Sequence, residues 1–388
     1  MTTKSILVNS NQQLAAAIRL VKGGETILLA PGDYGSVAIK GRNLSDTVTI
    51  KSANSNDDAV ISGLRIDSSS GFKIEDVNFH RELKSGEALH TQTVFVSSSQ
   101  RVTFSGVDFT GSLDNNAWND GFGLRVSNSS KIAVLDSTFR QLFRSAVFAN
   151  VDDMLVAGNT ISEVREGFNF AGVSNVMIAQ NRFSQFQPNY AARDHSDAIQ
   201  VFSDGTTGSS NVTIKNNIIT PGVSGGVQGI FIRAEDPASR HSNFVIENNL
   251  YYGDARHGIS SNGIDNVVIR GNTVVTAGSD GLEAAINVLN STRILVESNI
   301  TPMLLTRTNN VDIVLRDNVD LLDRKQWKGL TLEDVFELPK EIRFDETTFV
   351  SRTDAGFRAI DGIGSSTFDM QIPSSLGFVQ FAVADFLL

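Results

Sequence analysis

The sequence predicts an all-β protein, a right-handed parallel β-helix whose open end is covered by an N-terminal helix. A short strand-and-turn pattern returns at intervals of about 22 residues, as each coil of a solenoid requires. An amphipathic helical segment precedes the first repeat, and the pattern is lost near residue 321. We therefore expect a β-helix with its N-terminal cap over residues 1–320 and a C-terminal cap over residues 321–388.

The repeat is a short apolar strand, two polar or small residues, and then Asn, as in Val212-Thr-Ile214-Lys-Asn-Asn217. Stacked Asn side chains can hydrogen-bond from coil to coil, and Asn accepts the left-handed backbone that tight turns require. A β-sandwich would instead show hairpin turn dipeptides and no Asn at a constant phase. The Asn of the pattern recurs at seven positions: Asn159, Asn181, Asn217, Asn249, Asn272, Asn299 and Asn318.

Both ends of the chain suggest caps. Residues 11–21 have helical spacing of apolar residues and stop at Gly23-Gly24, which predicts the helix that covers the first coil. At the other end, residues 325–340 could include a short helix and residues 344–388 irregular strands. The last eight residues, 381–388, join an acidic residue to an apolar triplet, which resembles the C-terminal signal of type I secretion; a final strand or cap is the other interpretation.

Composition excludes several classes of protein. The formal net charge of −10 argues against nucleic-acid binding, and the chain contains no Cys, so disulfides and thiolate metal sites are excluded. No run of about 18 apolar residues predicts a membrane span. The N-terminus does not resemble a signal peptide. We expect a secreted protein, for which the C-terminal segment 381–388 suggests the type I route, and we expect it to be a monomer.

Two neighbouring coils are longer than the others. The intervals from Asn181 to Asn217 and on to Asn249 exceed the basic repeat, which predicts two long loops. Long loops on a rigid scaffold commonly carry binding and catalytic residues. These two are rich in ionisable side chains: Tyr190, Arg193, Asp194, His195 and Asp197 in the first, and Arg233, Glu235, Asp236, Arg240 and His241 in the second.

A second pattern, polar–small–apolar–x–apolar, begins at Asp120, Glu166, Asp197 and Gln228, and more loosely at His257. Its fourth position should point outward, since the third and fifth point to the core. Stacking then aligns four outward residues, and the position two further along adds Arg125 and Arg233 to the same face. Such a face would form a groove along the helix axis that suits an extended acidic sugar chain. The four aligned residues are Asn169, Gln200, Phe231 and Ser260.

The segment from Tyr190 to Gln200 resembles β-helix enzymes that act on uronate polymers, above all the mannuronan C5-epimerases and their lyase relatives. Tyr190 and His195 keep the five-residue spacing of that family's catalytic Tyr and His. The family has an Asp two residues before the His and an acidic residue just after it. Here Arg193 and Ser196 stand at those positions, with Asp194 and Asp197 each displaced by one. The specific match covers about eleven residues, whereas the general β-helix resemblance, including the entry seen in chondroitinase-B-like lyases, covers 1–320.

This resemblance implies a polysaccharide lyase that cleaves a uronate-containing acidic polysaccharide, such as alginate, by β-elimination; a C5-epimerase shares the first step. Either His195 or Tyr190 would remove the C5 proton, and the other would deliver one. Arg193 and Arg233 would neutralise the substrate carboxylate, and Asp194 or Asp197 would orient His195. Further residues expected to bind substrate are Arg165, Asn169, Gln200 and Phe231.

Two other functions stay open at this point. A polygalacturonase-like glycoside hydrolase needs paired carboxylates, for which Asp194 with Asp197 or Glu235 with Asp236 are available, but its adjacent Asp pair and Gly-His-Gly motif are missing. A tailspike-like or adhesin-like β-helix would bind sugar without turnover. Calcium would suit the many Asp and Asn oxygens, although no metal site can be named.

Overall fold

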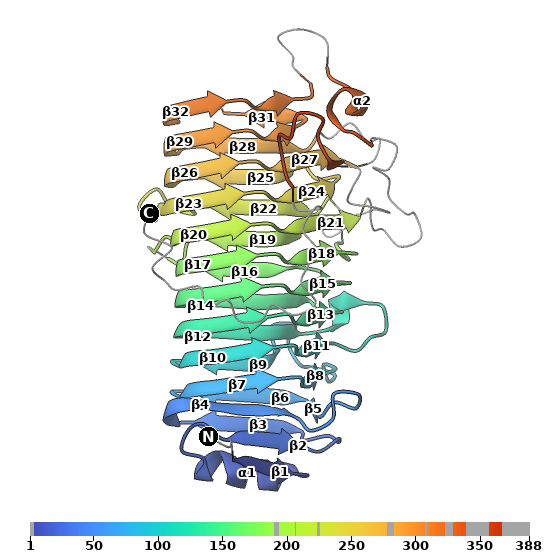
Figure 1. Ribbon diagram of the computed structural model, residues 1–388, viewed down its shortest axis with the longest axis vertical. Helices are drawn as coiled ribbons and strands as arrows, with labels where there is room; N and C mark the ends of the chain where they lie inside the picture. The colour runs from blue at the N-terminus through green and yellow to red at the C-terminus, as the bar shows by residue number, and fades with distance from the viewer. Residues whose placement is uncertain are drawn as a thin grey trace.

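The computed structural model describes residues 4–189, 194–205, 207–222, 226–277, 283–306, 309–322, 329–338 and 357–366. Within them the chain winds into a column of stacked coils with three parallel sheets along its sides (Figure 1). Every pairing between successive coils is parallel, for example β16 (Phe168–Ala171) with β19 (Asp197–Phe202) and β18 (Arg182–Ser184) with β21 (Ile218–Gly222). The predicted parallel β-helix is therefore confirmed.

The first sheet carries the candidate site, and the strands β12 and β14 run through both it and the second sheet. The first sheet contains β3 (Ser36–Lys40), β6 (Gly63–Asp67), β9 (Gln92–Ser97), β12 (Phe122–Leu135), β14 (Arg144–Ala157), β16 (Phe168–Ala171), β19 (Asp197–Phe202), β22 (Gln228–Arg233), β25 (His257–Asn262), β28 (Ala285–Leu289) and β31 (Met303–Leu305).

From β3 onward, the first, second and third sheets follow one another in this order along each coil. The second contains β1 (Ser5–Val8), β2 (Thr26–Leu29), β4 (Asn43–Ser52), β7 (Ser70–Glu75), β10 (Gln100–Ser105), β17 (Ser174–Ala179), β20 (Ser210–Lys215), β23 (His241–Glu247), β26 (Ile264–Arg270), β29 (Thr292–Glu297) and β32 (Val311–Arg316). The third contains β5 (Val60–Ile61), β8 (Asn78–His80), β11 (Asp108–Thr110), β13 (Thr138–Arg140), β15 (Thr160–Ser162), β18 (Arg182–Ser184), β21 (Ile218–Gly222), β24 (Leu250–Gly253), β27 (Thr273–Thr276), β30 (Ile300–Thr301) and β33 (Val319–Asp320).

The interior is filled by side chains that stack in rows along the axis. Phe79, Phe109 and Phe139 occupy the same register position on successive coils, and their rings stack with centroids 5.2 and 4.5 Å apart. Because inward and outward residues alternate along each strand, every coil adds apolar side chains to one continuous core. The rigid column fixes where the loops leave the sheets.

The predicted Asn ladder is confirmed at all seven positions. From Asn181 onward, each ladder amide accepts hydrogen bonds from the backbone N–H and side-chain amide of the Asn one coil earlier, as Asn217 does from Asn181 at 3.0 Å. Asn159, the first of the ladder, accepts from the backbone N–H of Ser137. The same contacts continue to Asn318. The left-handed residue of the turn, however, is the one before each ladder Asn: Asn216 and Asn248 have φ of 58° and 55°. The ladder Asn is selected for its hydrogen bonds, and its predecessor for its backbone.

Replacing Asn217 by Ala should lower the free energy of unfolding by about 1–3 kcal/mol, because buried hydrogen-bonding groups are left unsatisfied. Its side chain is buried and also donates to the carbonyls of Ile178 and Lys215. Urea denaturation of the purified protein measures the change. Asn318→Ala, at the half-buried end of the ladder, is the matched control and should cost less; equal losses at both positions would contradict the ladder account.

The N-terminal cap is confirmed as α1 (Asn11–Leu20), which begins at the N-cap Ser10 and buries Leu14, Ala17 and Ile18 against the first coil. At the other end, β33 stops at Asp320 and the short helix α2 (Leu332–Val335) follows. The described residues 357–366 pack beside the third sheet, where the Tyr252 and Phe357 rings meet at 5.2 Å. Residues 381–388, which carry the predicted secretion signal, lie outside the described residues. No described helix is long and apolar enough to cross a membrane.

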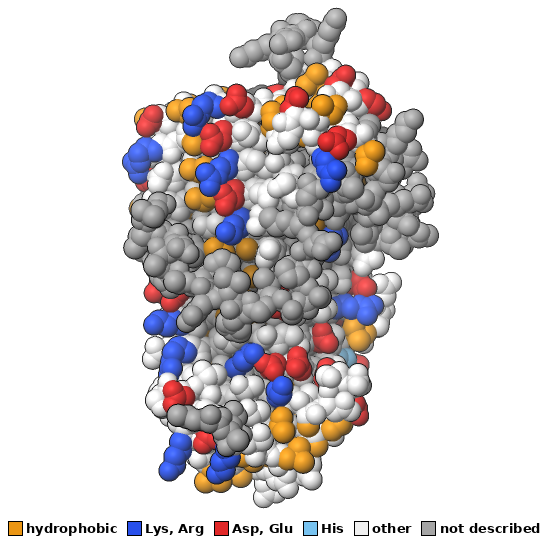
Figure 2. All heavy atoms as spheres, viewed as in Figure 1, with side chains coloured by type: hydrophobic (Ala, Val, Ile, Leu, Met, Phe, Trp, Pro, Cys, Tyr) orange, Lys and Arg blue, Asp and Glu red, His pale blue; other side chains and the backbone are white. Residues whose placement is uncertain are grey.

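Charged side chains on the outer face of the second sheet pair with each other from coil to coil. Arg270 contacts Glu247 at 2.6 Å, and Arg316 contacts Glu297 at 3.0 Å. Figure 2 shows this alternation of positive and negative charge over β23, β26, β29 and β32 at the upper left. The charges of these two pairs are therefore neutralised within the sheet.

Candidate active site

The long loops of several coils leave the column at one place, between the third sheet and the first. Residues 185–196 join β18 to β19, as predicted for the first long coil. Residues 81–91 and 111–121 form further loops at the same place that the Asn pattern did not predict. In those earlier coils Val77 and Val107 occupy the ladder position, so the repeat there carries no Asn signal.

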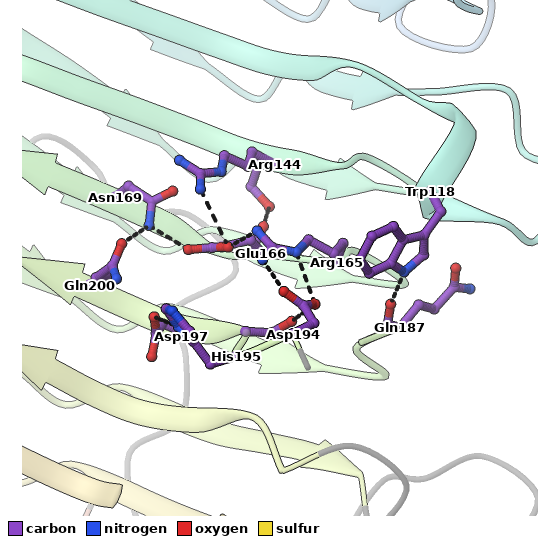
Figure 3. A network of polar contacts seen from close by, with 12 residues as sticks. Trp118, Arg144, Arg165, Glu166, Asn169, Gln187, Asp194, His195, Asp197 and Gln200 are labelled. Carbon is purple, nitrogen blue, oxygen red and sulfur yellow. Dashed lines mark hydrogen bonds and ion pairs between the residues drawn. The ribbon is translucent and has the colours of Figure 1, made fainter. Parts of the chain in front are cut away.

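Two predicted catalytic or binding residues of this loop, Tyr190 and Arg193, lie outside the described residues. Asp194, His195 and Asp197 are described and lie together with residues from two earlier coils (Figure 3). The segment 187–189 is held from the side by the 111–121 loop, where the Trp118 indole donates to the Gln187 carbonyl at 2.7 Å. The candidate site is thus built from three coils and a neighbouring loop.

A column of polar residues starts successive strands of the first sheet. Arg144 pairs with Phe122, and Asp197 pairs with Gln228; the register of β14, β16 and β19 places Glu166 between Arg144 and Asp197. Phe122 therefore aligns with this column. The predicted pattern of that coil began at Asp120 and was thus two residues out of register. For the same reason Arg125 falls in register with Asn169, not two positions beyond it.

Arg165 is the centre of the buried ion pairs. Its guanidinium donates to both carboxylate oxygens of Asp194, at 3.0 Å from Nε to Oδ2, and contacts the Glu166 carboxylate through Nη1. The rings of Phe143 and Trp118 lie 5.1 and 5.8 Å from it. Burial tends to lower the pKa of Arg165, but the Asp194 and Glu166 carboxylates raise it overall. Because these contacts occupy its donors, Arg165 is a positioning residue, and its predicted role in binding substrate is not supported.

Asp194 is likewise committed to structure. Burial tends to raise the pKa of its carboxyl, but the Arg165 hydrogen bonds and charge, together with the Ser196 hydroxyl, lower it overall. Its side chain is 5% exposed. Asp194 therefore anchors the chain next to His195 to Arg165, and its predicted role in binding substrate is not supported.

His195 is the exposed member of the cluster, with 68% of its side chain accessible. Its Nδ1 lies 3.6 Å from Oδ2 of Asp197, an ion-pair distance somewhat longer than a hydrogen bond. The facing Asp197 carboxylate raises the pKa of His195. Asp197 itself is completely buried, and among the described residues neither of its oxygens has a hydrogen-bond partner. Burial raises its pKa to about 7. His195 is thus open to a ligand and oriented from behind by a buried carboxyl group.

The predicted outward column is confirmed: Asn169, Gln200, Phe231 and Ser260 align on β16, β19, β22 and β25. Asn169 is nevertheless fully buried, because its amide donates to Glu166 at 2.8 Å and to Gln200 at 2.9 Å. It holds other site residues and does not itself reach a substrate. Gln200 and Phe231 are half-buried and stay candidates for substrate contact.

Arg233 does not join the cluster. It ends β22 and pairs with Phe202, five residues along the sheet from the Asp197–Gln228 pair. Its guanidinium lies 3.6 Å from Glu235, and both side chains are 52% exposed. At about 3.3 Å per strand residue, that places it roughly 16 Å from the column. The predicted catalytic role of Arg233 is therefore not supported. The charged residues of the first long coil lie at the start of β19, whereas those of the second lie at the end of β22.

Arg144 provides the partly exposed guanidinium that was expected of Arg233. Its side chain is 28% exposed, its Nη2 lies 3.7 Å from Glu166, and its Nε has no hydrogen-bond partner among the described residues. The guanidinium also lies 5.5 Å from the Phe122 ring. The sequence did carry a signal: Arg144-Ser-Ala-Val-Phe148 fits the polar–small–apolar–x–apolar pattern. Glu166, which began a predicted strand, was not recognised as a site residue.

The burial pattern decides what chemistry the described residues can perform. Glu166, Asp194 and Asp197 are 2%, 5% and 0% exposed, so none presents a carboxylate to a sugar. His195 does present an imidazole. Among the described residues no group of His, Asp and Glu is arranged to hold a metal ion, so calcium stays a prediction.

A polar hollow of about 390 Å³ lies elsewhere, between the first and second sheets near Ser69 and Ser99, and shares no residue with this cluster.

Comparisons with known proteins agree with the fold. A family model for right-handed β-helix regions matches residues 62–232, and no curated protein sequence matches the chain. An alginate lyase of Paenibacillus sp. strain FPU-7 superposes with a TM-score of 0.50 at 15% identity, covering 81% of this chain and all 100% of that one. A mannuronan C-5 epimerase A-module of Azotobacter vinelandii gives 0.51 at 15%, covering 80% and 89%. A family 28 exopolygalacturonase of Yersinia enterocolitica gives 0.51 at 9%, covering 82% and 78%. At these identities the likeness shows a shared right-handed parallel β-helix.

Proposed function

We propose that this protein cleaves a uronate-containing acidic polysaccharide by β-elimination, with His195 as the base that removes the C5 proton. The observation that carries the proposal is the pairing of an exposed imidazole with a buried carboxyl group, His195 with Asp197. A base of this kind needs a ring open to the substrate and a partner that fixes its orientation. The three structural neighbours named above, whose names refer to alginate, mannuronan and polygalacturonate, support the choice of polymer.

The same observation weakens the hydrolase alternative. Hydrolysis by paired carboxylates requires two acidic groups that flank the glycosidic bond and touch it. The described carboxyl groups of the cluster are buried behind Arg165 and His195, and the Glu235 and Asp236 pair lies beyond the far end of β22 with Arg233. Proton abstraction needs only one exposed base. Proton abstraction also needs a cation near the substrate carboxylate, where negative charge develops. Arg144 is the partly exposed cation of the cluster.

A panel assay tests the proposal. The protein is incubated with alginate, polygalacturonate, hyaluronan and bacterial acidic exopolysaccharides, with and without calcium, while the ultraviolet absorbance of a 4,5-unsaturated uronate is followed. A rise with one polymer is the expected result. New reducing ends without that absorbance would mean hydrolysis, and C5 inversion seen by proton NMR without cleavage would mean the epimerase, which begins with the same proton abstraction.

The pH dependence of kcat/KM should report the His195–Asp197 pair. A base works in its neutral form, so the rate should fall as the pH drops through the pKa of His195, which Asp197 holds above 6.5. In Asp197→Asn the anion is gone and the pKa of His195 decreases, so the acid limb of the profile should move to lower pH while the maximal rate falls. An unmoved limb would show that Asp197 does not act on His195.

Secretion and the exporting role of residues 381–388 belong to this proposal, because polymers of this kind lie outside the cell. A monomer remains the expected state. Tyr190 keeps its predicted role as the second proton-transfer group, and Arg193 its role in binding the substrate carboxylate. Tyr190→Phe is the natural companion of the His195 variant in the panel assay.

A further inference from the structure

A row of cationic and aromatic side chains continues the outer face of the first sheet toward the N-terminal coils. Arg65 on β6, Phe95 on β9 and Arg125 on β12 are in register with one another. The same register runs on through β14 to Asn169 and Gln200 beside the candidate site. In Figure 1 these strands lie one below another in a single stack. The row is therefore continuous with the site along the helix axis.

The cations of this row are not neutralised by neighbouring carboxylates. The Arg65 guanidinium lies 4.8 Å from the centre of the Phe95 ring, and the Arg125 Nε donates to the Ser127 hydroxyl at 3.4 Å. In the part of the chain that the structure describes, neither arginine forms an ion pair. Arg65 is exposed, and Phe95 and Arg125 are half-buried. Arg270 and Arg316 on the second sheet, by contrast, are each paired with a glutamate.

The first-sheet parts of β3, β6, β9 and β12 contain one acidic residue, Asp67, and it is already engaged. Asp67, two residues after Arg65 on β6, accepts a hydrogen bond from the Ser97 hydroxyl at 2.5 Å. Lys40 aligns with Asp67 on the preceding coil and is exposed. The local balance of Arg65, Arg125 and Lys40 against Asp67 is positive, although the whole chain carries a net charge of −10. A local cationic row on an acidic protein is suited to a polyanion.

We infer that Arg65, Phe95 and Arg125 form a distal binding site for the same acidic polysaccharide, an inference that rests on the proposed function. The two guanidinium groups would bind carboxylates of the polymer through charge-assisted hydrogen bonds. The Phe95 ring between them would contact the apolar face of a sugar ring.

The spacing of the coils determines which substrates this site selects. Adjacent strands lie about 4.8 Å apart, close to the length of one sugar residue in an extended chain. From Gln200 to Phe95 there are four such steps, about 19 Å. A trisaccharide bound at His195 does not reach Phe95, whereas a polymer that follows the axis does. The distal site therefore favours long chains over short ones.

The test compares chain lengths in matched variants. The double variant Arg65→Ala/Arg125→Ala and the single variant Phe95→Ala remove the site. Arg270→Ala/Arg316→Ala removes the same charge from the second sheet and is the control. For polymeric alginate, or the polymer that the panel identifies, KM should rise about tenfold in the site variants, as expected when charge-assisted contacts are lost. The kcat value, and the KM for the corresponding trisaccharide, should stay unchanged.

Binding is measured separately from turnover, by affinity electrophoresis through gels that contain the polymer, in the His195→Ala background. Weaker retardation of the site variants than of the control supports the inference even if no turnover is found, in which case only the proposed function fails. Turnover with identical KM values for the site variants and the control overturns the inference and leaves the function intact. An equal rise in KM for trisaccharide and polymer, or no retardation by any polymer of the panel, overturns it as well.

Discussion

His195→Ala should reduce kcat on the polymer by about 10²–10⁴-fold, the usual contribution of a positioned general base. The reason is geometric: His195 is 68% exposed, whereas the carboxyl groups behind it are buried and cannot replace it. Initial rates of formation of unsaturated uronate measure the loss. The stability of the fold should change little, because an exposed side chain makes few packing contacts.

A matched control separates the loss of this base from a general effect of removing an imidazole. His90 is also exposed, but it lies in the 81–91 loop between β8 and β9, in an earlier coil than the clustered residues. His90→Ala should keep the wild-type kcat. Wild-type kcat in His195→Ala, or an equal loss in both variants, would remove His195 from the mechanism.

Arg165→Met should lower the free energy of unfolding by about 3–5 kcal/mol at neutral pH, because it leaves the buried Asp194 carboxylate without its cation and the Glu166 carboxylate with only the more distant Arg144. Asp194 and Glu166 are 5% and 2% exposed, and Arg165 is 11% exposed. Urea denaturation measures the change. The pKa of Asp194 is lowered from 3.8 by Arg165, so this ion pair stabilises the fold above that pH and loses its effect as the pH falls through the lowered value. The deficit of the variant should therefore shrink in acid.

The control for Arg165 is an exposed ion pair elsewhere on the column. Arg270 is 52% exposed and pairs with Glu247 on the second sheet. Arg270→Met should cost less than about 1 kcal/mol, since an exposed pair gains little over its hydrated partners. If Arg165→Met costs no more than this, the buried network does not organise the site.

The fold could be predicted from the sequence because Asn recurs at one position of the repeat in seven coils. Seven ladder Asn residues occur at a constant distance from the preceding apolar strand, and their hydrogen bonds explain why that residue type recurs. The coils before Asn159 could not be counted in this way, since Val77 and Val107 fill the same position by packing alone. Their long loops were missed for that reason.

The site was predicted in part. His195 and Asp197 were found because adjacent ionisable residues in a long coil are conspicuous in the sequence. Arg144 and Glu166 were missed, because their place depends on how neighbouring coils stack, and one coil was assigned two residues out of register. Arg233 was wrongly joined to the cluster, since sequence order alone does not show at which end of a strand a loop charge lies. Asn169 and Arg165 were predicted to bind substrate but are buried and act as positioning residues. Their burial results from the stacking of neighbouring coils, which the sequence of one coil does not show.

The most direct test of the central claim is a mass spectrum of the products formed from the active polymer. Abstraction of the C5 proton followed by elimination predicts fragments whose new non-reducing ends are one water lighter than the ends formed by hydrolysis. Their formation should cease in His195→Ala. Fragments that each carry the elements of an added water, still formed by His195→Ala, would show that the protein is a hydrolase and would contradict the assignment of His195 as the base.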